Sequence, residues 1–197
     1  MTEVATSESR PLRADARRNR DALLENAAAA FAEHGVDASL EDIARRTGVG
    51  IGTLYRHFPT REALVEAAYR RGVESMCDAA DELLATNPPD VALEQWMLRF
   101  VGYIATKRGL AATLKEAADS HLELFAAMRA RIDAAMTGLV DAAAKAGVIR
   151  ADASPADLLR AIGGVCMVSG EGGSEDQSRR LVGLLMDGLR YGAPQRA

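Results

Sequence analysis

One stretch of this chain constrains its fold more than any other, the segment from Ser39 to Phe58, SLEDIARRTGVGIGTLYRHF. Ser39 followed by Asp42 is a helix start signal, because the serine hydroxyl can accept a backbone N–H of the first turn. Gly48 interrupts the apolar periodicity, and glycine allows turns that cost other residues more. Pro59 ends the pattern, because the residue before a proline avoids the α region. The stretch therefore predicts two short helices joined by a sharp turn.

The second of these helices has two different faces. At about 100° per residue, Ile51, Leu54 and Phe58 share the side that should pack inward. Gly52 and Arg56 point away from that side, and the flanks carry Thr53, Tyr55 and His57. A helix of this size spans roughly 10 Å, which suits a major groove roughly 12 Å wide. The pattern predicts a helix-turn-helix of the DNA-binding kind, although an ordinary αα-corner has the same spacing.

The surrounding residues favour the DNA-binding interpretation. The segment from Ala22 to Leu64, ALLENAAAAFAEHGVDASLEDIARRTGVGIGTLYRHFPTREAL, closely resembles the N-terminal domain of the tetracycline-repressor (TetR) family of bacterial transcription regulators. The matching residues are Phe31, Gly35, Ile43, Ala44, Gly48, Val49, Thr53, Leu54, Tyr55, His57, Phe58 and Leu64. The resemblance implies a three-helix DNA-binding domain followed by a helical domain for ligand binding and dimerisation. The rest of the chain carries no comparable motif, although it resembles the SbtR-like subgroup.

Composition and periodicity predict an all-α fold of about nine helices. Alanine is abundant and aromatic residues make up only 5% of the chain, which favours helix over sheet. We expect a disordered tail at 1–11, a DNA-binding domain at 12–62, and a ligand-binding and dimerisation domain at 63–197. The expected helices cover about 13–34, two segments between 39 and 58, then 60–86, 90–106, 110–118, 119–146, 154–169 and 177–191.

Net charge is a weak guide to the partner of this chain. The formal charge is −4, whereas a pure DNA-binding module is usually basic. Residues 10–72 nevertheless hold 11 arginines against 9 acidic residues, and local clusters steer binding better than net charge does. The sequence shows no apolar run for a membrane helix and no signal peptide, and its two cysteines are not in metal spacing. We expect a cytoplasmic protein whose thiols are reduced and buried.

The outer face of the second short helix supplies the expected base contacts. Arg56 and Thr53 are assigned to base reading, because arginine pairs with guanine and threonine reaches thymine methyls. Gly52 permits close approach to the groove floor. The other expected DNA contacts, mainly to phosphates, come from Arg17, Ser39, Tyr55, His57 and Arg61.

Two features near this face have alternative explanations. Arg17 belongs to a cationic run with Arg10, Arg13, Arg18 and Arg20, and such a run is also what a solvated helix start looks like. Many TetR relatives carry a serine that caps the second short helix, whereas this chain has Gly50 there. The missing hydroxyl predicts a helix start that frays until DNA binds.

A stripe of methionine and aromatic residues on two later helices is the candidate ligand site. The family resemblance implies a pocket there, and its lining would suit a hydrophobic ligand of modest size. The candidates are Trp96, Met97, Phe100, Tyr103, His121, Phe125, Met128 and Cys166. Ordinary core packing produces the same stripe, and a histidine such as His121 can simply lie at the surface or cap its helix.

The last two expected helices, near 154–169 and 177–191, are amphipathic and carry the small residues Gly163, Gly164 and Gly183. We expect them to pair with their copies in a homodimer, because two-fold symmetry doubles the contacts to a palindromic operator. The alternative is that they only close the core of the monomer.

Catalysis is not expected from this sequence. None of its three histidines belongs to a hydrolase or metalloprotease motif, and its glycines fit neither a phosphate loop nor a dinucleotide fingerprint. No cofactor or metal is expected either. The resemblance to the TetR family implies a ligand-released transcriptional repressor, and the alternative is a DNA-binding regulator without a small-molecule ligand, either architectural or controlled by a partner protein.

Overall fold

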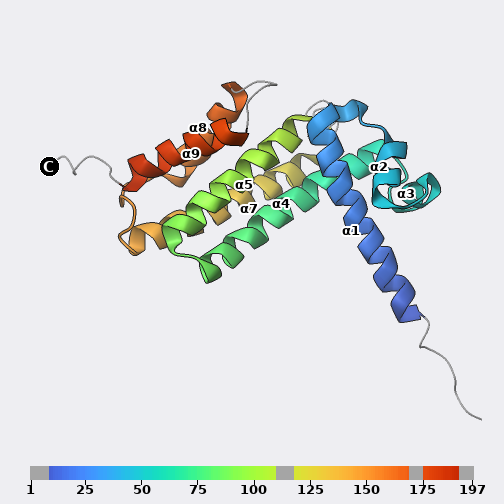
Figure 1. Cartoon of the computed structure of the whole chain (residues 1–197), viewed down its shortest axis with the longest axis horizontal. Coiled ribbons are helices and arrows are strands. Elements are labelled where there is room, and N and C mark those ends of the chain that lie inside the picture. The colour runs from blue at the N-terminus through green and yellow to red at the C-terminus, as the bar shows by residue number, and fades with distance from the viewer. Residues whose placement is uncertain (1–8, 110–117, 169–174, 191–197) are drawn as a thin grey trace, which may run out of the picture. The chain divides into compact units, whose positions relative to one another are not determined.

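The structure is a computed structural model, and it describes residues 9–109, 118–168 and 175–190. Within these ranges the chain forms eight α-helices and one short 3₁₀ helix, with no strand (Figure 1). The expected all-α fold class is confirmed. The helix expected at 110–118 lies outside the described residues, apart from its last position. None of the described helices combines the length and the apolar character needed to cross a membrane.

The described residues divide into two compact units, whose boundary lies inside helix α4 (Arg61–Thr86). The first unit contains the described residues up to Arg71 together with Arg108 and Gly109. The second unit contains Gly72–Lys107 and the described residues from Ala118 onward. The limits of 12–62 and 63–197 for the functional domains stay a prediction.

The first unit begins with α1 (Ser9–His34) and the 3₁₀ helix η1 (Gly35–Asp37), which lead into the two short helices α2 (Leu40–Thr47) and α3 (Ile51–His57). Helix α1 starts earlier than expected, so the predicted tail at 1–11 is wrong for residues 9–11. Pro11 does not prevent this, because a proline in the first helical turn removes an N–H that has no partner in the helix anyway.

A single apolar core joins the helices of the first unit. Leu23 and Phe31 of α1 are fully buried, and so are Ile43 of α2, Leu54 of α3 and Leu64 of α4. Buried residues spaced four apart, such as Leu23, Ala27 and Phe31 in α1, lie on one face of their helix. The core also contains Leu24, Ala27, Ala30, Ala38, Leu40, Ala44, Phe58, Val65 and Ala68.

The turn between α2 and α3 is set by Gly48, which has a left-handed φ of 77°. Its N–H donates to the carbonyl of Arg45 at 3.0 Å, and the N–H of Val49 donates to the carbonyl of Ala44 at 3.0 Å. These bonds satisfy carbonyls that the end of α2 would otherwise leave without a partner. The turn therefore ends α2 cleanly and lets α3 begin three residues later.

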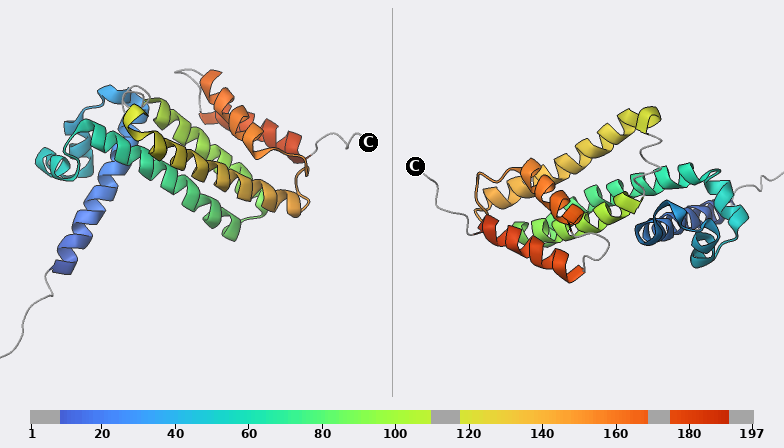
Figure 2. Two further views of the ribbon diagram at one scale, coloured as in Figure 1. Left: turned by 180° about the vertical axis from the view of Figure 1, so that it is seen from behind. Right: turned by 90° about the horizontal axis from the view of Figure 1, so that it is seen from above.

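The second unit consists of the remainder of α4 with α5 (Pro89–Gly109), α7 (Ala118–Lys145), α8 (Pro155–Val168) and α9 (Glu175–Arg190). These limits agree with the expected helices to within about three residues. Figure 2 shows α8 and α9 as neighbouring helices. The backbone N–H of Arg150, just before α8, donates to the carbonyl of Leu189 at 2.9 Å, so the two helices run antiparallel.

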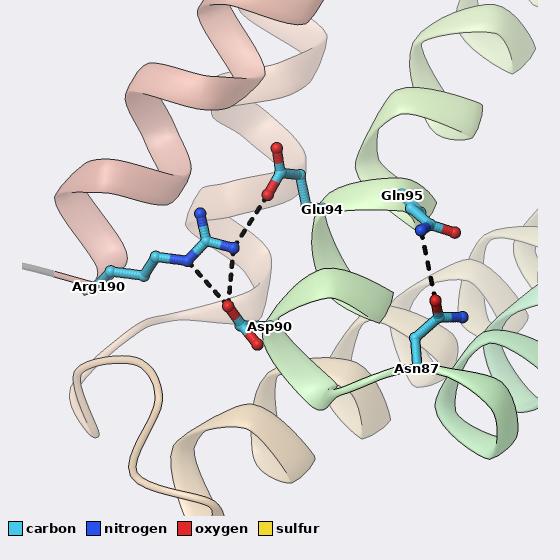
Figure 3. A network of polar contacts seen from close by, with 5 residues as sticks. All are labelled: Asn87, Asp90, Glu94, Gln95 and Arg190. Atoms are coloured by element: carbon cyan, nitrogen blue, oxygen red, sulfur yellow. Dashed lines mark hydrogen bonds and ion pairs between the residues drawn. The ribbon is translucent and has the colours of Figure 1, made fainter.

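Two polar connections hold α5 in the second unit. The indole Nε1–H of Trp96 donates to the carbonyl of Met76 on α4 at 2.8 Å. At the start of α5, Asp90 and Glu94 receive hydrogen bonds from Arg190, the last residue of α9 (Figure 3). Helix α5 is therefore tied to α4 on one side and to α9 on another.

The left-handed turn gives a test on stability. We expect Gly48→Ala to destabilise the first unit by about 1–2 kcal/mol, because a Cβ penalises positive φ. Gly52→Ala is the matched control: Gly52 lies inside α3 with no atom within 4 Å of a built Cβ, so the change should stabilise by up to about 1 kcal/mol. Native-state hydrogen exchange of the α2 and α3 amides measures both, and equal shifts of the same sign would contradict this account.

Candidate nucleic-acid interface

Helix α3 has a buried face and an exposed face, as the sequence predicts. Leu54 is fully buried and Phe58 is 3% exposed, while Ile51 is only half-buried. On the opposite side Gly52 and Arg56 are exposed. Three predicted contact residues flank them, the exposed Tyr55 and the half-buried Thr53 and His57. The structure therefore brings these five predicted DNA contacts together on one short helix.

The start of α3 depends on backbone contacts alone. The carbonyl of Gly50 accepts the N–H of Thr53 at 2.8 Å and that of Leu54 at 3.3 Å, and no side chain caps the helix. The first N–H groups of a helix carry partial positive charge, and they attract phosphate when no side chain occupies them.

Ser39 caps α2 as expected. Its hydroxyl oxygen accepts the N–H of Asp42 at 3.2 Å, and the hydroxyl donates to Oε2 of Glu41 at 3.2 Å. The side chain is therefore engaged in holding the start of α2. Its role as a DNA contact stays a prediction.

Arg61 lies in the first turn of α4 and makes an internal contact that the sequence did not indicate. Its Nη1 donates to the carbonyl of Ala38 at 2.9 Å, which ties the start of α4 to the residue just before α2. Thr60 caps α4, with its hydroxyl oxygen accepting the N–H of Ala63 at 3.1 Å. Hydrogen bonds from its own backbone N–H and from Thr60 hold the pKa of the Glu62 carboxyl below its usual range. The start of α4 thus carries both signs of charge.

The cationic run on α1 contains residues with different roles. Arg17 is exposed, and Arg18 contacts Asp15 within the same helix. Arg20 instead places its guanidinium over the ring of Phe58, with 5.4 Å from Cζ to the ring centroid. This is a cation–π contact between α1 and the end of α3. Spacing in the sequence indicates only that Arg20, four residues before the buried Leu24, borders the apolar face of α1, and it does not identify Phe58 as the partner.

Four of the eight predicted ligand-site residues lie in the core of the second unit. Trp96, Met97, Phe100 and Met128 are buried, and the rings of Trp96 and Phe100 stack with centroids 5.3 Å apart. The Tyr103 ring stacks on Phe100 at 5.7 Å and lies 3.5 Å from a Cβ built at Gly72 of α4. The remaining candidates are the half-buried Phe125 of α7, and His121 and Cys166, whose side chains lie outside the described part of the structure.

The described cysteine, Cys77 on α4, is half-buried, so the expectation of a fully buried thiol is wrong for it. Burial raises the pKa of the Cys77 thiol, although Arg131 opposes the shift. The thiol therefore stays protonated at neutral pH and is a poor nucleophile. In the described ranges no group of three or more His, Cys, Asp and Glu side chains is placed to hold a metal ion.

Two family models match the sequence. The model for bacterial regulatory proteins of the tetR family matches residues 23–68. The model for the C-terminal domain of SbtR-like transcriptional regulators matches residues 88–191. Together they match a large part of each unit of the structure.

Solved structures resemble the chain over most of its length. A TetR transcriptional regulator from Streptomyces coelicolor is 46% identical, with a TM-score of 0.81 over 88% of this chain and 99% of that one. The TetR transcription regulatory protein from Mycobacterium vanbaalenii is 38% identical, with a TM-score of 0.70 over 91% of this chain and 99% of that one.

A curated relative matches a shorter part of the chain. An HTH-type transcriptional regulator of Staphylococcus aureus (strain MRSA252) is 39% identical over 70 residues, which are 34% of this chain and 34% of that protein. The chain therefore matches about a third of the length of this relative.

The contact between Arg20 and Phe58 gives a test on the first unit. We expect Arg20→Ala to lower its stability by about 0.5–1 kcal/mol, the typical value of an exposed cation–π contact. Arg17→Ala is the matched control and should leave stability unchanged, because Arg17 is exposed on the same helix. The free energy of unfolding is measured in denaturant for both variants and again in a Phe58→Leu background. A destabilisation by Arg20→Ala that persists in full without the ring would contradict the cation–π assignment.

Proposed function

Because the chain belongs to the TetR family of bacterial transcription regulators, we propose that it represses transcription as a homodimer bound to a near-palindromic operator and that a small molecule releases it. The observation that carries the proposal is the exposed face of α3, where Gly52 and Arg56 lie opposite the buried Leu54. A bound dimer would block RNA polymerase by occupying the operator. Such a regulator acts in the cytoplasm, where the chromosome lies.

In the proposed complex, some residues of the first unit contact bases and others contact phosphates. Arg56 and Thr53 read base edges in the major groove, and Gly52 lets the helix axis come close to the groove floor. The phosphate contacts come from side chains at the rim of the same surface, namely Arg17, Tyr55, His57 and Arg61. Ser39 holds the N-terminus of α2, where backbone N–H groups attract a further phosphate. These contacts add affinity and set the register without reading sequence.

The homodimer is proposed to form through α8 and α9. Leu184 of α9 is 67% exposed, whereas Val182 and Met186, each two residues away, are buried. A Cβ built at Gly163 of α8 or Gly183 of α9 meets no atom within 4 Å, so these glycines are not required by packing within the chain. A second copy that covers this face would bury Leu184 and bring two α3 helices to one operator.

The ligand is proposed to bind in the second unit near the aromatic residues of α5 and Phe125 and Met128 of α7. A hydrophobic molecule that displaces α5 would act on α4, because Trp96 and Tyr103 both contact that helix. A tilt of α4 would change the separation of the two α3 helices, which must match about 34–36 Å or a multiple of it. The coupling would be reciprocal, so that operator DNA weakens ligand binding.

One observation favours a second candidate, a regulator without a small-molecule ligand. The Trp96 side chain is 0% exposed and its indole N–H already has a partner, and Met97 is 0% exposed too. These residues behave as ordinary core, and a ligand that used them would have to displace existing packing. Control by a partner protein, or an architectural role on DNA, needs no such displacement.

The experiment that tests the function is selection of bound sites from random duplex DNA at about 150 mM salt, where nonspecific binding is suppressed. We expect an enriched inverted repeat whose half-sites lie about one helical turn, or a multiple of it, apart. No enrichment by a folded dimer would contradict a sequence-specific repressor that binds without a co-repressor. Enrichment of a single half-site would contradict binding as a dimer to an inverted repeat, but not sequence-specific binding.

The assignment of Arg56 has its own test. We expect Arg56→Ala to relax selection at one position of each half-site and to cost about 1–3 kcal/mol on the operator. Arg17→Ala is the matched control and should weaken operator and random DNA alike, with a salt slope smaller by about 0.9 for each phosphate that the variant no longer neutralises. Equal weakening on both DNAs for Arg56→Ala would show that this arginine contacts phosphate rather than a base.

A further inference from the structure

Arg190 ends α9 and forms a three-bond fork with two carboxylates of α5 (Figure 3). Its Nε and Nη2 donate to Oδ2 of Asp90 at 2.9 and 2.7 Å, and Nη2 also donates to Oε2 of Glu94 at 3.0 Å. Arg190 is 100 positions from Asp90 and 96 from Glu94 in the sequence. The fork is therefore a long-range connection between two helices rather than a local surface pair.

The fork is less exposed to solvent than the ion pair between Arg129 and Asp133 on α7. The side chains of Arg190 and Asp90 are 27% and 19% exposed, whereas those of Arg129 and Asp133 on α7 are 62% and 49% exposed. Less solvent screens the attraction at the fork, and charge-assisted bonds in a fixed planar geometry are the strong ones. The hydrogen bonds to the carboxylates raise the pKa of the Arg190 guanidinium, so the guanidinium stays charged.

The helix dipoles of α5 and α9 strengthen the attraction between Asp90 and Arg190. Asp90 lies in the first turn of α5, where the helix dipole favours a negative charge, and Arg190 lies in the last turn of α9, where it favours a positive one. Without Arg190, two carboxylates four residues apart on α5 would repel each other. The N-terminus of α5 and the C-terminus of α9 thus attract each other through both side chains and backbone.

The hydrogen bonds of the fork constrain the orientation of α9, which its apolar contacts do not. Val182, Met186 and Leu189 form the buried stripe of α9, and burial of apolar surface stabilises without fixing an orientation. The fork, together with the bond from the N–H of Arg150 to the carbonyl of Leu189, fixes the C-terminal end of the helix. The rotation of α9 about its axis is therefore set at that end.

That rotation decides where the exposed side of α9 points. Leu184 lies two residues from Val182 and two from Met186, so at about 100° per residue it faces almost directly away from the buried stripe. We propose that Arg190 is a positioning residue for subunit pairing, whose fork with Asp90 and Glu94 holds Leu184 in the orientation that a second copy of the chain requires. This inference rests on the homodimer proposed above.

The test measures dimerisation of the full chain by sedimentation velocity over a dilution series. We expect Arg190→Ala to raise the dimer dissociation constant about 10-fold or more, which corresponds to the removal of one charge-assisted bond. Arg129→Ala is the matched control, because its ion pair with Asp133 lies within one helix, and it should dimerise as the wild type does. Leu184→Glu places a charge on the proposed face and should abolish pairing.

A charge swap separates positioning from mere stability. Arg190→Glu alone places three carboxylates together and should pair more weakly than Arg190→Ala. Adding Asp90→Arg restores an attraction of opposite sense and should recover at least part of the affinity. If Arg190→Ala does not fold by circular dichroism, Arg190→Lys keeps the charge without the planar fork, and an intermediate dissociation constant is expected.

The outcomes that overturn the inference are distinct from those that overturn the dimer. A wild-type chain that sediments as a monomer at micromolar concentration overturns both. If the wild type is a dimer and both Arg190→Ala and Arg190→Lys have the dimer dissociation constant of the wild type, the inference alone is overturned. An Arg190→Ala variant that melts at a lower temperature but keeps the wild-type dimer dissociation constant also overturns the inference, because the fork would then only stabilise the monomer.

Discussion

The left-handed backbone at Gly48 is the constraint on which the recognition surface depends. It ends α2 and lets α3 start at a new angle only three residues later, with the N–H of Val49 closing the turn on Ala44. Because the turn determines the direction of α3, it also determines that Leu54 enters the core and that Arg56 faces outward. A residue with a Cβ at position 48 would oppose that geometry directly. The set of side chains that α3 presents at its exposed face thus depends on one backbone conformation.

Arginine serves two purposes in the first unit. Arg56 and Arg17 are exposed on its surface, as a cation that meets DNA should be. Arg20 and Arg61 also make contacts inside the unit, Arg20 with the ring of Phe58 and Arg61 with the carbonyl of Ala38 just before α2. The guanidinium suits both purposes, because it can lie flat on an aromatic ring or donate several hydrogen bonds. A count of positive charges therefore does not by itself tell which arginines also stabilise the fold.

Helix α5 is the connecting element of the second unit. Trp96 joins it to α4 by the indole N–H, and Tyr103 lies against Gly72 of the same helix. At its start, Asp90 and Glu94 join it to the end of α9. In the proposed regulator α4 carries the ligand response and α9 the subunit pairing, so the helix between them is placed to link the two events.

The sequence by its local patterns determined the helices, the turn at Gly48, the inward side of α3 and the family, because each of these depends on residues within a few positions of one another. The limits of α1 shifted only where Pro11 proved compatible with a first helical turn. Contacts between distant residues were decided by tertiary structure alone. No local pattern indicates that Arg20 lies over Phe58 or that Arg190 meets Asp90, since the partner of a side chain is chosen by how helices pack in space.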